Sequence, residues 1–455
     1  MTTPRRTPSE LRDHALRIWR AGVAGVAPAR LLAEWVQLDG DWLLVGDEQF
    51  ALADLGRIAV VGGGKAGAAM AVALEATLGR AALVQTDLTG VMSVPADCLA
   101  PTQCIELVAG RPAGVNEPRA EGVAAVQRML QLATSLGPRD LCLCLLSGGG
   151  SALLPAPIAG FSLADKIELT RLLSAAGATI EQLNAVRREL SAIKGGGLAR
   201  ACTAGRLISL IISDVPGDDL ATIASGPTVP RVPTPQAAID ALHELRVADE
   251  PVVRRALTIL QDAAARRESV RPSVGRVDNF LIGNNAVAVD AAGVEAERLG
   301  YSHAMVSAQA PEGPAEEVAR KLAGMAADMR ATPGPDCLIS GGEPTVKLAP
   351  PELRGRGGRN QQLCLAALDA MRDWQGIALV SGGTDGEDGP TDAAGALVDE
   401  QIAAEAKRLQ LDSRDYLARS DAYSFFEQVG GLIKTGPTNT NVCDLRVITV
   451  SQHEG

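Results

Sequence analysis

The sequence predicts an α/β protein built from two Rossmann-like domains with largely parallel sheets and a functional cleft between the domains. Short apolar runs of strand length alternate with segments of helical periodicity along the 455 residues. This alternation is typical of parallel sheets that helices cover on both faces. Most of the glycine-rich turns in the chain directly follow one of these apolar runs, and ligands of such sheets collect at the carboxyl ends of the strands.

The strands are predicted where an apolar run of strand length is bounded by turn residues. They cover residues 57–62, 81–86, 141–147, 207–213, 279–283, 303–308, 337–340, 377–381 and 445–450. Helices are predicted between them, where apolar residues recur at helical spacing. They cover residues 66–78, 119–133, 163–175, 252–267, 285–299 and 315–329.

Two segments are candidates for a domain boundary. Residues 227–235 are rich in proline, and residues 266–276 are charged and contain proline. We place the boundary in the second segment, which gives a first α/β domain over residues 1–265 and a second over residues 266–455. The sequence leaves open that one segment crosses back into the other domain.

Composition excludes several classes of partner. The net charge of −11 argues against a nucleic acid or an anionic membrane surface, and the aromatic content of 3% is too low for base-stacking platforms. The N-terminal residues contain no apolar h-region or small-residue cleavage site, so we expect no secretory leader, and we also expect no membrane-spanning segment. The eight cysteines form no metal-type pair. We therefore expect a cytoplasmic protein with a small-molecule substrate, and the sequence allows a homodimer.

Glycine-rich turns are the most informative motif. A glycine turn can expose consecutive backbone N–H groups, which bind phosphate oxygens. Three of the turns contain the cations Lys65, Lys194, Arg356 and Arg359, and local cations in an acidic protein suit a small anionic ligand. The turns lie at residues 62–65, 147–151, 194–197, 340–343, 356–359 and 381–386.

The first turn supports two different reactions. Gly62, Gly64 and Gly67 fit the Gly-x-Gly-x-x-Gly fingerprint of a dinucleotide site, and Asp87 lies 20 residues beyond Gly67. An NAD(P)-dependent dehydrogenase is therefore a serious alternative. The turn fails as a Walker A loop, because Ala66 follows the lysine where Ser or Thr should hold magnesium.

The later turns favour phosphoryl transfer over hydride transfer. The histidines lie outside every glycine turn, which leaves a dehydrogenase without the usual proton donor. A phosphotransferase needs N–H donors, several cations, and carboxylates for magnesium and for the attacking hydroxyl. Residues 213–219 and 384–392 follow apolar runs and supply such carboxylates, among them Asp214 and Asp385.

These motifs together resemble the glycerate 2-kinase family, the class II glycerate kinases with a C-terminal MOFRL domain. The resemblance covers nearly the whole chain after about residue 55, with the motifs in the same order. Members of this family have often been labelled hydroxypyruvate reductases. The motifs are the Lys65 turn, residues 146–153, 184–187, 190–196, 213–219, 223–228, 355–360 and 384–386, and the ending at residues 435–442.

The resemblance implies ATP- and magnesium-dependent phosphorylation of D-glycerate, with 2-phosphoglycerate as the expected product. Lys65 and Arg359 would stabilise the transferring phosphoryl group. Asp214 would act as base or, with Asp385, as a magnesium ligand, and Arg187 and Asp218 would bind the substrate. The nucleotide and its phosphates would be bound by Gly63, Gly64, Ser147, Gly148, Gly149, Gly150, Ser151, Lys194, Gly341, Gly342, Glu343, Asn360, Thr384 and Asp385.

Each catalytic assignment has a structural alternative. Lys65 could be a solvated lysine, Arg359 could form a structural salt bridge, and Asp214 could cap the following turn. The chain also departs from the family at Arg111, where members usually carry histidine. An NAD(P)-dependent hydroxypyruvate reductase and a nucleotide-binding protein without catalysis are the two other hypotheses.

Overall fold

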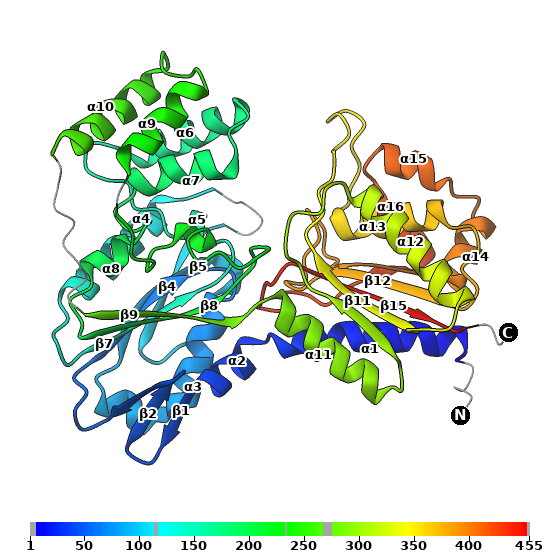
Figure 1. Ribbon diagram of the computed structural model, residues 1–455, viewed down its shortest axis with the longest axis horizontal. Helices are drawn as coiled ribbons and strands as arrows, with labels where there is room; N and C mark the ends of the chain where they lie inside the picture. The colour runs from blue at the N-terminus through cyan, green and yellow to red at the C-terminus, as the bar shows by residue number, and fades with distance from the viewer. Residues whose placement is uncertain (1–5, 113–116, 233, 267–274, 453–455) are drawn as a thin grey trace. The chain divides into compact units, whose positions relative to one another are not determined.

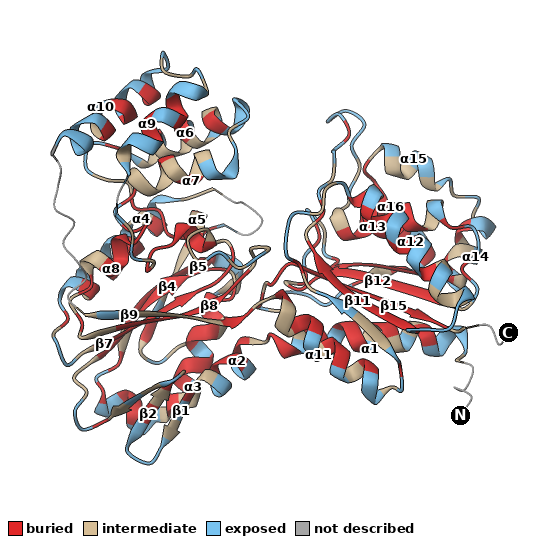
Figure 2. Ribbon diagram, viewed as in Figure 1, coloured by how far each residue is buried: buried red, intermediate tan, exposed pale blue. Residues whose placement is uncertain are grey.

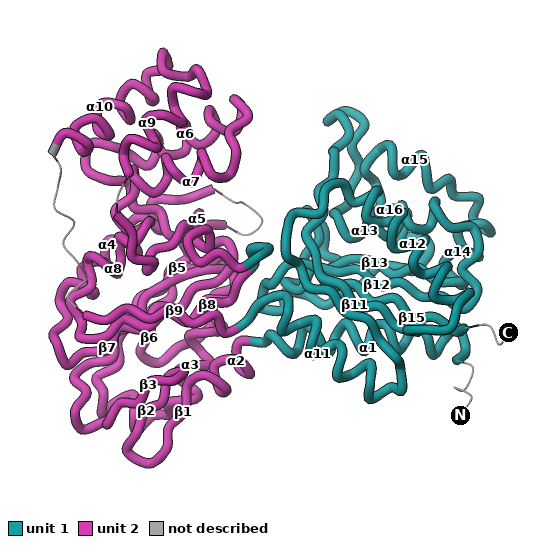
Figure 3. Tube along the Cα trace, in the orientation of Figure 1, with its two compact units in different colours: residues 1–27, 214–217, 283–455 teal, residues 28–213, 218–282 magenta. Residues whose placement is uncertain are grey.

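The computed structural model describes residues 6–112, 117–232, 234–266 and 275–452. It is an α/β protein, as predicted, and it divides into two compact units (Figure 3). Unit 1 contains residues 1–27, 214–217 and 283–455, and unit 2 contains residues 28–213 and 218–282.

Unit 2 is built on a parallel sheet in the order β6-β5-β4-β7-β8-β9. The chain starts this sheet at β4, adds β5 and β6 on one side, and returns to place β7, β8 and β9 on the other. The paired strands from β6 to β8 run parallel to one another. The bounds are β4 Ile58–Gly63, β5 Thr89–Pro95, β6 Ile105–Arg111, β7 Leu141–Leu146, β8 Arg206–Ile212 and β9 Arg276–Gly283.

This strand order is that of a doubly wound sheet, and its topological switch point lies between β4 and β7. Their carboxyl ends meet at one edge, where Gly63 pairs with Leu146. Every residue of these two strands is buried, as Figure 2 shows for the centre of the sheet. The helices that pack on the sheet include α3 (Gly67–Gln85) and α4 (Ala120–Thr134).

Two smaller layers complete unit 2 (Figure 1). Helix α2 (Pro28–Trp35) leads into a three-stranded antiparallel sheet that the sequence analysis did not predict. A second layer is helical and has an apolar core of its own. The strands are β1 Val36–Asp39, β2 Trp42–Val45 and β3 Glu48–Ala51, and the helices are α6 Leu163–Ala175, α7 Ile180–Glu189, α9 Pro235–Glu244 and α10 Pro251–Arg266.

Unit 1 contains a six-stranded sheet in the order β10-β11-β15-β12-β13-β14. This sheet is mixed rather than largely parallel. Only β10 and β11 pair in parallel, and the other four pairings are antiparallel. The last strand lies between β11 and β12 and runs opposite to both. The bounds are β10 His303–Val306, β11 Cys337–Gly342, β12 Ile377–Gly383, β13 Gly395–Asp399, β14 Leu432–Ile433 and β15 Asp444–Val450.

The helices of unit 1 pack on this sheet and share one apolar core with it. The N-terminal helix α1 contributes Trp19, which is 1% exposed and whose Nε1 donates a hydrogen bond to the Gly382 carbonyl. The helices are α1 Pro8–Gly25, α11 Asn285–Arg298, α12 Ala315–Ala331, α13 Arg359–Ala370, α14 Glu400–Arg408, α15 Ser413–Ala418 and α16 Ala422–Val429.

The observed division differs from the expected boundary at residue 265. The chain passes between the units after residues 27, 213, 217 and 282. The N-terminal segment joins unit 1 because α1 packs its apolar face on α11 and β15, where Gly22 leaves no room for a side chain beside Leu445. The segment 214–217, which carries Asp214, also belongs to unit 1.

One predicted strand is wrong. Residues 81–86 form the last turns of α3 and the residue that follows it, instead of a strand. Gly79, at φ 69°, interrupts the helix and made the following apolar segment look like a separate element. The segment contains Ala and Leu, which are strong helix formers. The strand that pairs with β4 is β5, further along the chain.

Helix α3 also bears on the expectation that no segment spans a membrane. Among the described residues it is the one helix long and apolar enough to do so by length and composition, with a mean hydropathy of 1.4. More than half of the apolar window, 56%, is buried inside the protein. The helix contacts β4, β5 and β7, which is the usual environment of a core helix.

Candidate active site

Two glycine turns meet at the switch point of unit 2. Ser147 N–H donates to the Gly63 carbonyl at 3.2 Å, and Lys65 N–H donates to the Gly148 carbonyl at 2.8 Å. The backbones approach too closely for any side chain. A Cβ on Gly64, which has φ 141°, would lie 2.1 Å from Ser147 Oγ. Ser147 itself is fully buried, and its Oγ accepts a hydrogen bond from Ala66 N–H.

The turn after β7 presents backbone donors. Gly149 adopts the left-handed conformation at φ 78°, and Gly150 begins the short helix α5 (Gly150–Leu153). No described residue accepts a hydrogen bond from the N–H of Gly149 or Gly150. Gly150 is buried and Gly149 is partly buried, and because a buried N–H group without a partner is costly, these donors fit an anion that accepts hydrogen bonds from them.

Two cations border this turn. A Cβ placed on Gly149 would lie 3.5 Å from Lys65 Cγ and 4.0 Å from Arg111 Nη2. The position where family members usually carry histidine is therefore occupied here by a buried arginine beside the glycine turn. The arginine adds a positive charge to the turn that Lys65 also borders.

Lys194 is a buried ammonium group beside the same turn. Its side chain is among the largest fully buried ones, and its Nζ donates to the Ala224 carbonyl at 3.1 Å and to Ser151 Oγ at 3.3 Å. Both acceptors are neutral. Burial lowers the pKa of Lys194 well below its usual value, and the nearby cations Lys166, Arg187 and Arg188 lower it further. This local excess of positive charge favours an anionic ligand.

The glycines after Lys194 are used differently from what the sequence analysis expected. Gly195 N–H donates to the Ser225 carbonyl and Gly196 N–H to the Gly226 carbonyl. These bonds hold a segment in which Ala224, Ser225 and Gly226 all have positive φ. Left-handed residues other than glycine are strained and concentrate at functional sites. The turn therefore fixes Lys194 through its partner segment instead of offering free N–H groups.

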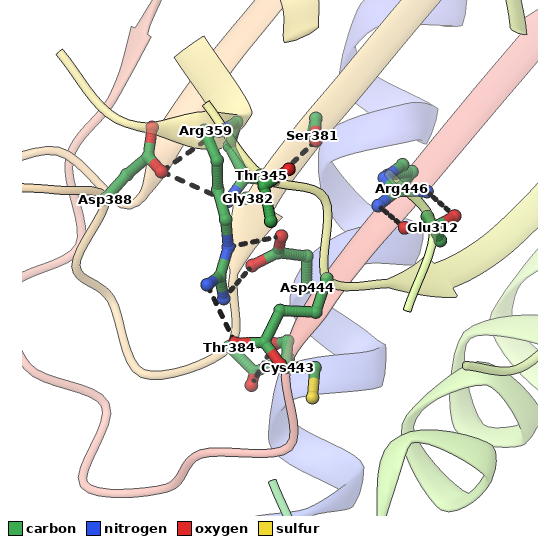
Figure 4. Close-up of polar contacts among 12 residues, drawn as sticks. Glu312, Thr345, Arg359, Ser381, Gly382, Thr384, Asp388, Cys443, Asp444 and Arg446 are labelled. Atoms are coloured by element: carbon green, nitrogen blue, oxygen red, sulfur yellow. Dashed lines mark hydrogen bonds and ion pairs between the residues drawn. The ribbon is translucent and has the colours of Figure 1, made fainter. Parts of the chain in front are cut away.

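In unit 1, Arg359 is the first residue of α13 and forms a network of ion pairs (Figure 4). Its Nε and Nη2 contact both oxygens of Asp444 at 2.8 and 2.9 Å, and its Nη1 contacts Glu343 Oε1 at 2.9 Å. Burial alone lowers the pKa of Arg359, but the facing carboxylates outweigh burial and raise it. The salt bridge considered as the alternative role of Arg359 is thus present, and Asp444 is a residue that the sequence analysis missed.

The N-terminus of α13 is occupied by a carboxylate of the protein itself. Asp388 accepts hydrogen bonds from the N–H groups of Asn360 and Gln361, at 3.0 and 2.8 Å. The side chain of Asn360 is fully buried between Asp388 and Ser381. The predicted nucleotide contact by Asn360 therefore has a competing internal role. Burial raises the pKa of Asp388 to about 7.

This raised pKa predicts a pH-dependent stability. Between pH 4 and pH 7 the unfolded state releases the Asp388 proton before the folded state does, so the stabilisation present at low pH is lost as pH rises through about 7. From pH 5 to pH 8 the free energy of unfolding of the wild type should fall by about 2 kcal/mol more than that of Asp388→Asn, because asparagine does not titrate. Urea unfolding of both proteins at the two pH values measures this difference. An unchanged difference would mean that Asp388 stays ionised throughout.

Asp214 lies in unit 1 beside the segment that precedes β15. Its Oδ2 accepts a hydrogen bond from Asn441 Nδ2 at 3.2 Å, and its carbonyl accepts one from Cys443 Sγ at 3.0 Å. Burial, followed by the charges of Glu343, Asp214 and Asp444, raises the pKa of the Cys443 thiol. Asp214 is thereby placed in the same unit and near the same thiol as the carboxylates that contact Arg359.

The remaining predicted residues of unit 1 surround the end of β12. A Cβ on Gly383 would lie 3.0 Å from Asp385 Oδ1 and 3.7 Å from Asp444 Oδ1, so both carboxylates face this glycine. Thr384 is buried and bonds to the Cys443 carbonyl, which indicates a structural role. In the described part of the chain, no group of three or more His, Cys, Asp or Glu side chains has the arrangement of a metal site.

Three further predicted residues are Gly341, Gly342 and Asp218. Gly341 and Gly342 end β11, where a Cβ would collide with Asn285 or with the buried ion pair of Arg446 and Glu312 (Figure 4). These glycines are required by packing. Asp218 returns the chain to unit 2 with φ 56°.

The structure thus gathers the predicted residues into two groups, one in each unit. The group of unit 2 consists of Gly63, Gly64, Lys65, residues 147–151, Arg187, Lys194 and Asp218. The group of unit 1 consists of Asp214, residues 341–343, Arg359, Asn360, Thr384 and Asp385. Asp444 was missed because a carboxylate at the start of a strand carries no motif.

The position of Asp87 argues against the dinucleotide site. In that fingerprint the acid that contacts the ribose follows the second strand, near the glycine turn. Asp87 instead precedes β5, and Ile58 N–H at the start of β4 donates to the Thr86 carbonyl. Because β4 and β5 are parallel, Asp87 lies at the edge of the sheet opposite to Gly62 and Gly64.

Comparison with known proteins gives consistent matches along the chain. A family model described as a domain of unknown function, DUF4147, matches residues 14–258, and the MOFRL family model matches residues 336–444. The glycerate kinase of Homo sapiens is 37% identical, with 96% of this chain and 93% of that protein covered. A putative hydroxypyruvate reductase of Agrobacterium vitis is 39% identical over 87% of this chain and 100% of that protein.

The fold also matches a solved structure. The crystal structure of the glycerate kinase of Thermotoga maritima aligns with a TM-score of 0.81 and 33% identity, and the alignment covers 97% of this chain and 100% of that one.

Proposed function

The chain belongs to the glycerate kinase family, and we propose that it transfers the γ-phosphoryl group of ATP to the 2-hydroxyl of D-glycerate in a magnesium-dependent reaction. Its similarity to glycerate kinases identifies the protein as a kinase. The magnesium requirement, the position of the accepting hydroxyl and the roles of individual residues are parts of the proposal.

One observation carries the proposed phosphate site. At the switch point of unit 2, the N–H groups of Gly149 and Gly150 have no described acceptor, and Lys65 and Arg111 border the same turn. Consecutive glycine N–H groups with flanking cations are suited to phosphate oxygens. A reductase needs the ribose-binding acid instead, and Asp87 lies at the wrong edge of the sheet.

The residue roles follow from charge and position. We assign Lys65 and Arg359 to the transferring phosphoryl group and Lys194 to the nucleotide phosphates, with Arg187 and Asp218 on the substrate side. The reaction would take place between the two units, so that both contribute to one transition state. We also propose a cytoplasmic location, which agrees with the absence of disulfide bonds among the eight cysteines, all of which are described.

Magnesium fits the donor chemistry of unit 1. Asp214 and Asp385 carry the carboxylate oxygens that Mg²⁺ prefers, and Mg²⁺ is often held by only one or two carboxylates together with substrate phosphates. When bound, the ion would neutralise charge on the β- and γ-phosphates. Asp214 is also the candidate base, which would accept the proton of the glycerate hydroxyl at a carboxylate oxygen.

The function is tested by paired assays of the purified protein. We expect ATP consumption only when magnesium and D-glycerate are both present, and no NADH oxidation with hydroxypyruvate. Enolase added to the kinase reaction without phosphoglycerate mutase should convert the product at once, because enolase acts on 2-phosphoglycerate. NADH turnover without ATP turnover would restore the reductase, and a product that needs the mutase would move the reaction to the 3-hydroxyl.

A further inference from the structure

A small pocket lies inside the helical layer of unit 2, between α6 and α7. Its volume of about 20 Å³ has room for one small group. Its walls are mainly aliphatic, with Leu169 and Leu173 from α6 and Val186 from α7. Two cations, Lys166 and Arg187, also line it. Figure 1 shows the two helices in this layer.

Within the part of the chain that the structure describes, no carboxylate pairs with either of these two cations. Neither the Lys166 nor the Arg187 side chain makes a hydrogen bond or ion pair with any residue in the described ranges, whereas Arg171 of α6 pairs with Glu117. Burial lowers the pKa of Lys166 to about 8, with a further contribution from Arg187, and burial also lowers the pKa of Arg187. Partly buried cations without a partner are costly, so an anion at this position would be bound favourably.

The donors of the pocket suit one negative charge on a small group. The lining residues recur at helical spacing, so the pocket is bounded by helix faces whose N–H groups are already bonded within the helices. Only side chains can donate. The glycine turns, by contrast, offer backbone N–H groups suited to phosphates. A carboxylate is small enough for the pocket and matches its two side-chain cations.

The pocket lies next to the proposed phosphate site. The charges of Lys166 and Arg187 both lower the pKa of Lys194, whose Nζ contacts Ser151. Helix α7 connects the two places. Asn184, one turn before Arg187, accepts a hydrogen bond from Ser225 Oγ at 3.5 Å, and Ser225 Oγ is 3.2 Å from Ser151 Oγ.

We propose that Lys166 and Arg187 bind the carboxylate of the phosphoryl acceptor and thereby select a short hydroxy acid over an uncharged polyol or amide. Lys166 is the new residue in this assignment, since no motif marked it. The identity of the acceptor as glycerate depends on the proposed function, but the recognition of a small carboxylate at this pocket does not.

The proposal is tested with Lys166→Met and Arg187→Met, which keep much of the side-chain volume and remove the charge. We expect the KM for D-glycerate to rise about 10- to 100-fold in each variant, the usual effect of losing a charge-assisted hydrogen bond, while the KM for ATP and kcat change less than about threefold. Arg171→Met is the matched control, because Arg171 is an exposed cation of the same helix. Its KM for D-glycerate should stay at the wild-type value.

A second experiment compares the binding of a charged ligand with that of a neutral one. Wild type should bind D-glycerate far more tightly than D-glyceramide, in which a neutral amide replaces the carboxylate, and Lys166→Met should reduce this preference at least about 10-fold in calorimetry without ATP. Lys166→Arg, which keeps the charge, should restore most of it. This conservative variant also separates a lost contact from a folding defect.

The outcomes separate this inference from the proposed function. If wild type phosphorylates glycerate and both methionine variants keep its KM and its preference for the acid, the inference is wrong and the function stands. If wild type shows no kinase activity but Lys166→Met still abolishes carboxylate binding, the pocket stands and the function falls. A raised KM for ATP alone would assign the pocket to a phosphate and overturn the inference.

Discussion

Replacement of Asp214 by Asn is expected to lower kcat at least about 100-fold in a protein that remains folded. The carboxylate is assigned either to accept the proton of the attacking hydroxyl or to hold magnesium, and an amide can do neither well. Asparagine has nearly the size and shape of aspartate, and its amide oxygen can still accept the hydrogen bond from Asn441 Nδ2, so we expect the variant to fold. Steady-state kinetics with saturating ATP and D-glycerate, together with thermal unfolding, measure both effects.

Asp219→Asn provides the matched control for this prediction. Asp219 is a nearby carboxylate whose oxygens bond locally, to Thr222 Oγ1 and Ala221 N–H, and it has no assigned role in the reaction. We expect kcat of this variant to stay within about threefold of wild type. A near-normal kcat in Asp214→Asn would return Asp214 to a structural role in its turn.

Magnesium titration separates the two roles of Asp214. If the carboxylate is a metal ligand, Asp214→Asn should raise the magnesium concentration needed for half-maximal activity, and excess magnesium should recover part of the rate. If it is the base, excess magnesium should recover nothing, because the proton acceptor is missing at every metal concentration.

The sequence was sufficient for β4, β7, β8 and β9 of the sheet of unit 2, but not for β5 and β6, where no strand was predicted. Buried strands of parallel sheets appear as continuous apolar runs, and β4, β7 and β8 are such runs. Gly64, which follows β4, is needed because a Cβ there would collide with Ser147 in the neighbouring turn. An apolar run followed by glycines therefore identifies both the strand and the tight loop after it.

Strand direction and long-range docking could not be read in the same way. An apolar run such as β15 looks the same in either direction, and its antiparallel place between β11 and β12 depends on the whole of unit 1. Helix α1 has an apolar face, but the sequence does not say which sheet that face covers. The ion pair of Arg359 with Asp444 joins residues 85 positions apart and belongs to no local motif.

Whether a predicted polar residue is available to a ligand depends on the hydrogen bonds that its side chain already makes within the protein. Asn360 and Thr384 follow glycine motifs, yet their side chains are buried in internal hydrogen bonds. Lys194 is just as buried, but its acceptors are neutral and its neighbours are cations. Sequence spacing cannot distinguish these two situations, because the distinction depends on whether the partner charge is supplied by the protein.

Lys65→Ala and Arg359→Lys are each expected to lower kcat about 100-fold or more. Both cations are assigned to charge that grows as the phosphoryl group is transferred, so kcat should fall more than the KM for glycerate rises. Arg359→Lys should be damaging although it keeps the charge. A lysine cannot copy the planar fork that contacts both oxygens of Asp444.

A structural effect of Arg359→Lys must be separated from a catalytic one. Asp444 is 0% exposed, so weakening its partner should also lower stability. Arg446→Lys is the matched control, because Arg446 forms a similar fork with Glu312 in the same unit (Figure 4). We expect a comparable fall in the melting temperature of both variants, but a large loss of kcat only in Arg359→Lys. Equal losses of kcat would reduce Arg359 to a structural residue.

The double variant tests whether Lys65 and Arg359, which belong to different units, act on one phosphoryl group. Residues that act together on one transition state give non-additive losses, so the double variant should be little slower than the slower single variant. Independent sites would multiply their effects on kcat. Full multiplication in folded protein would reject a shared transition state, and a wild-type kcat in Lys65→Ala would leave the glycine turn after β4 without its catalytic cation.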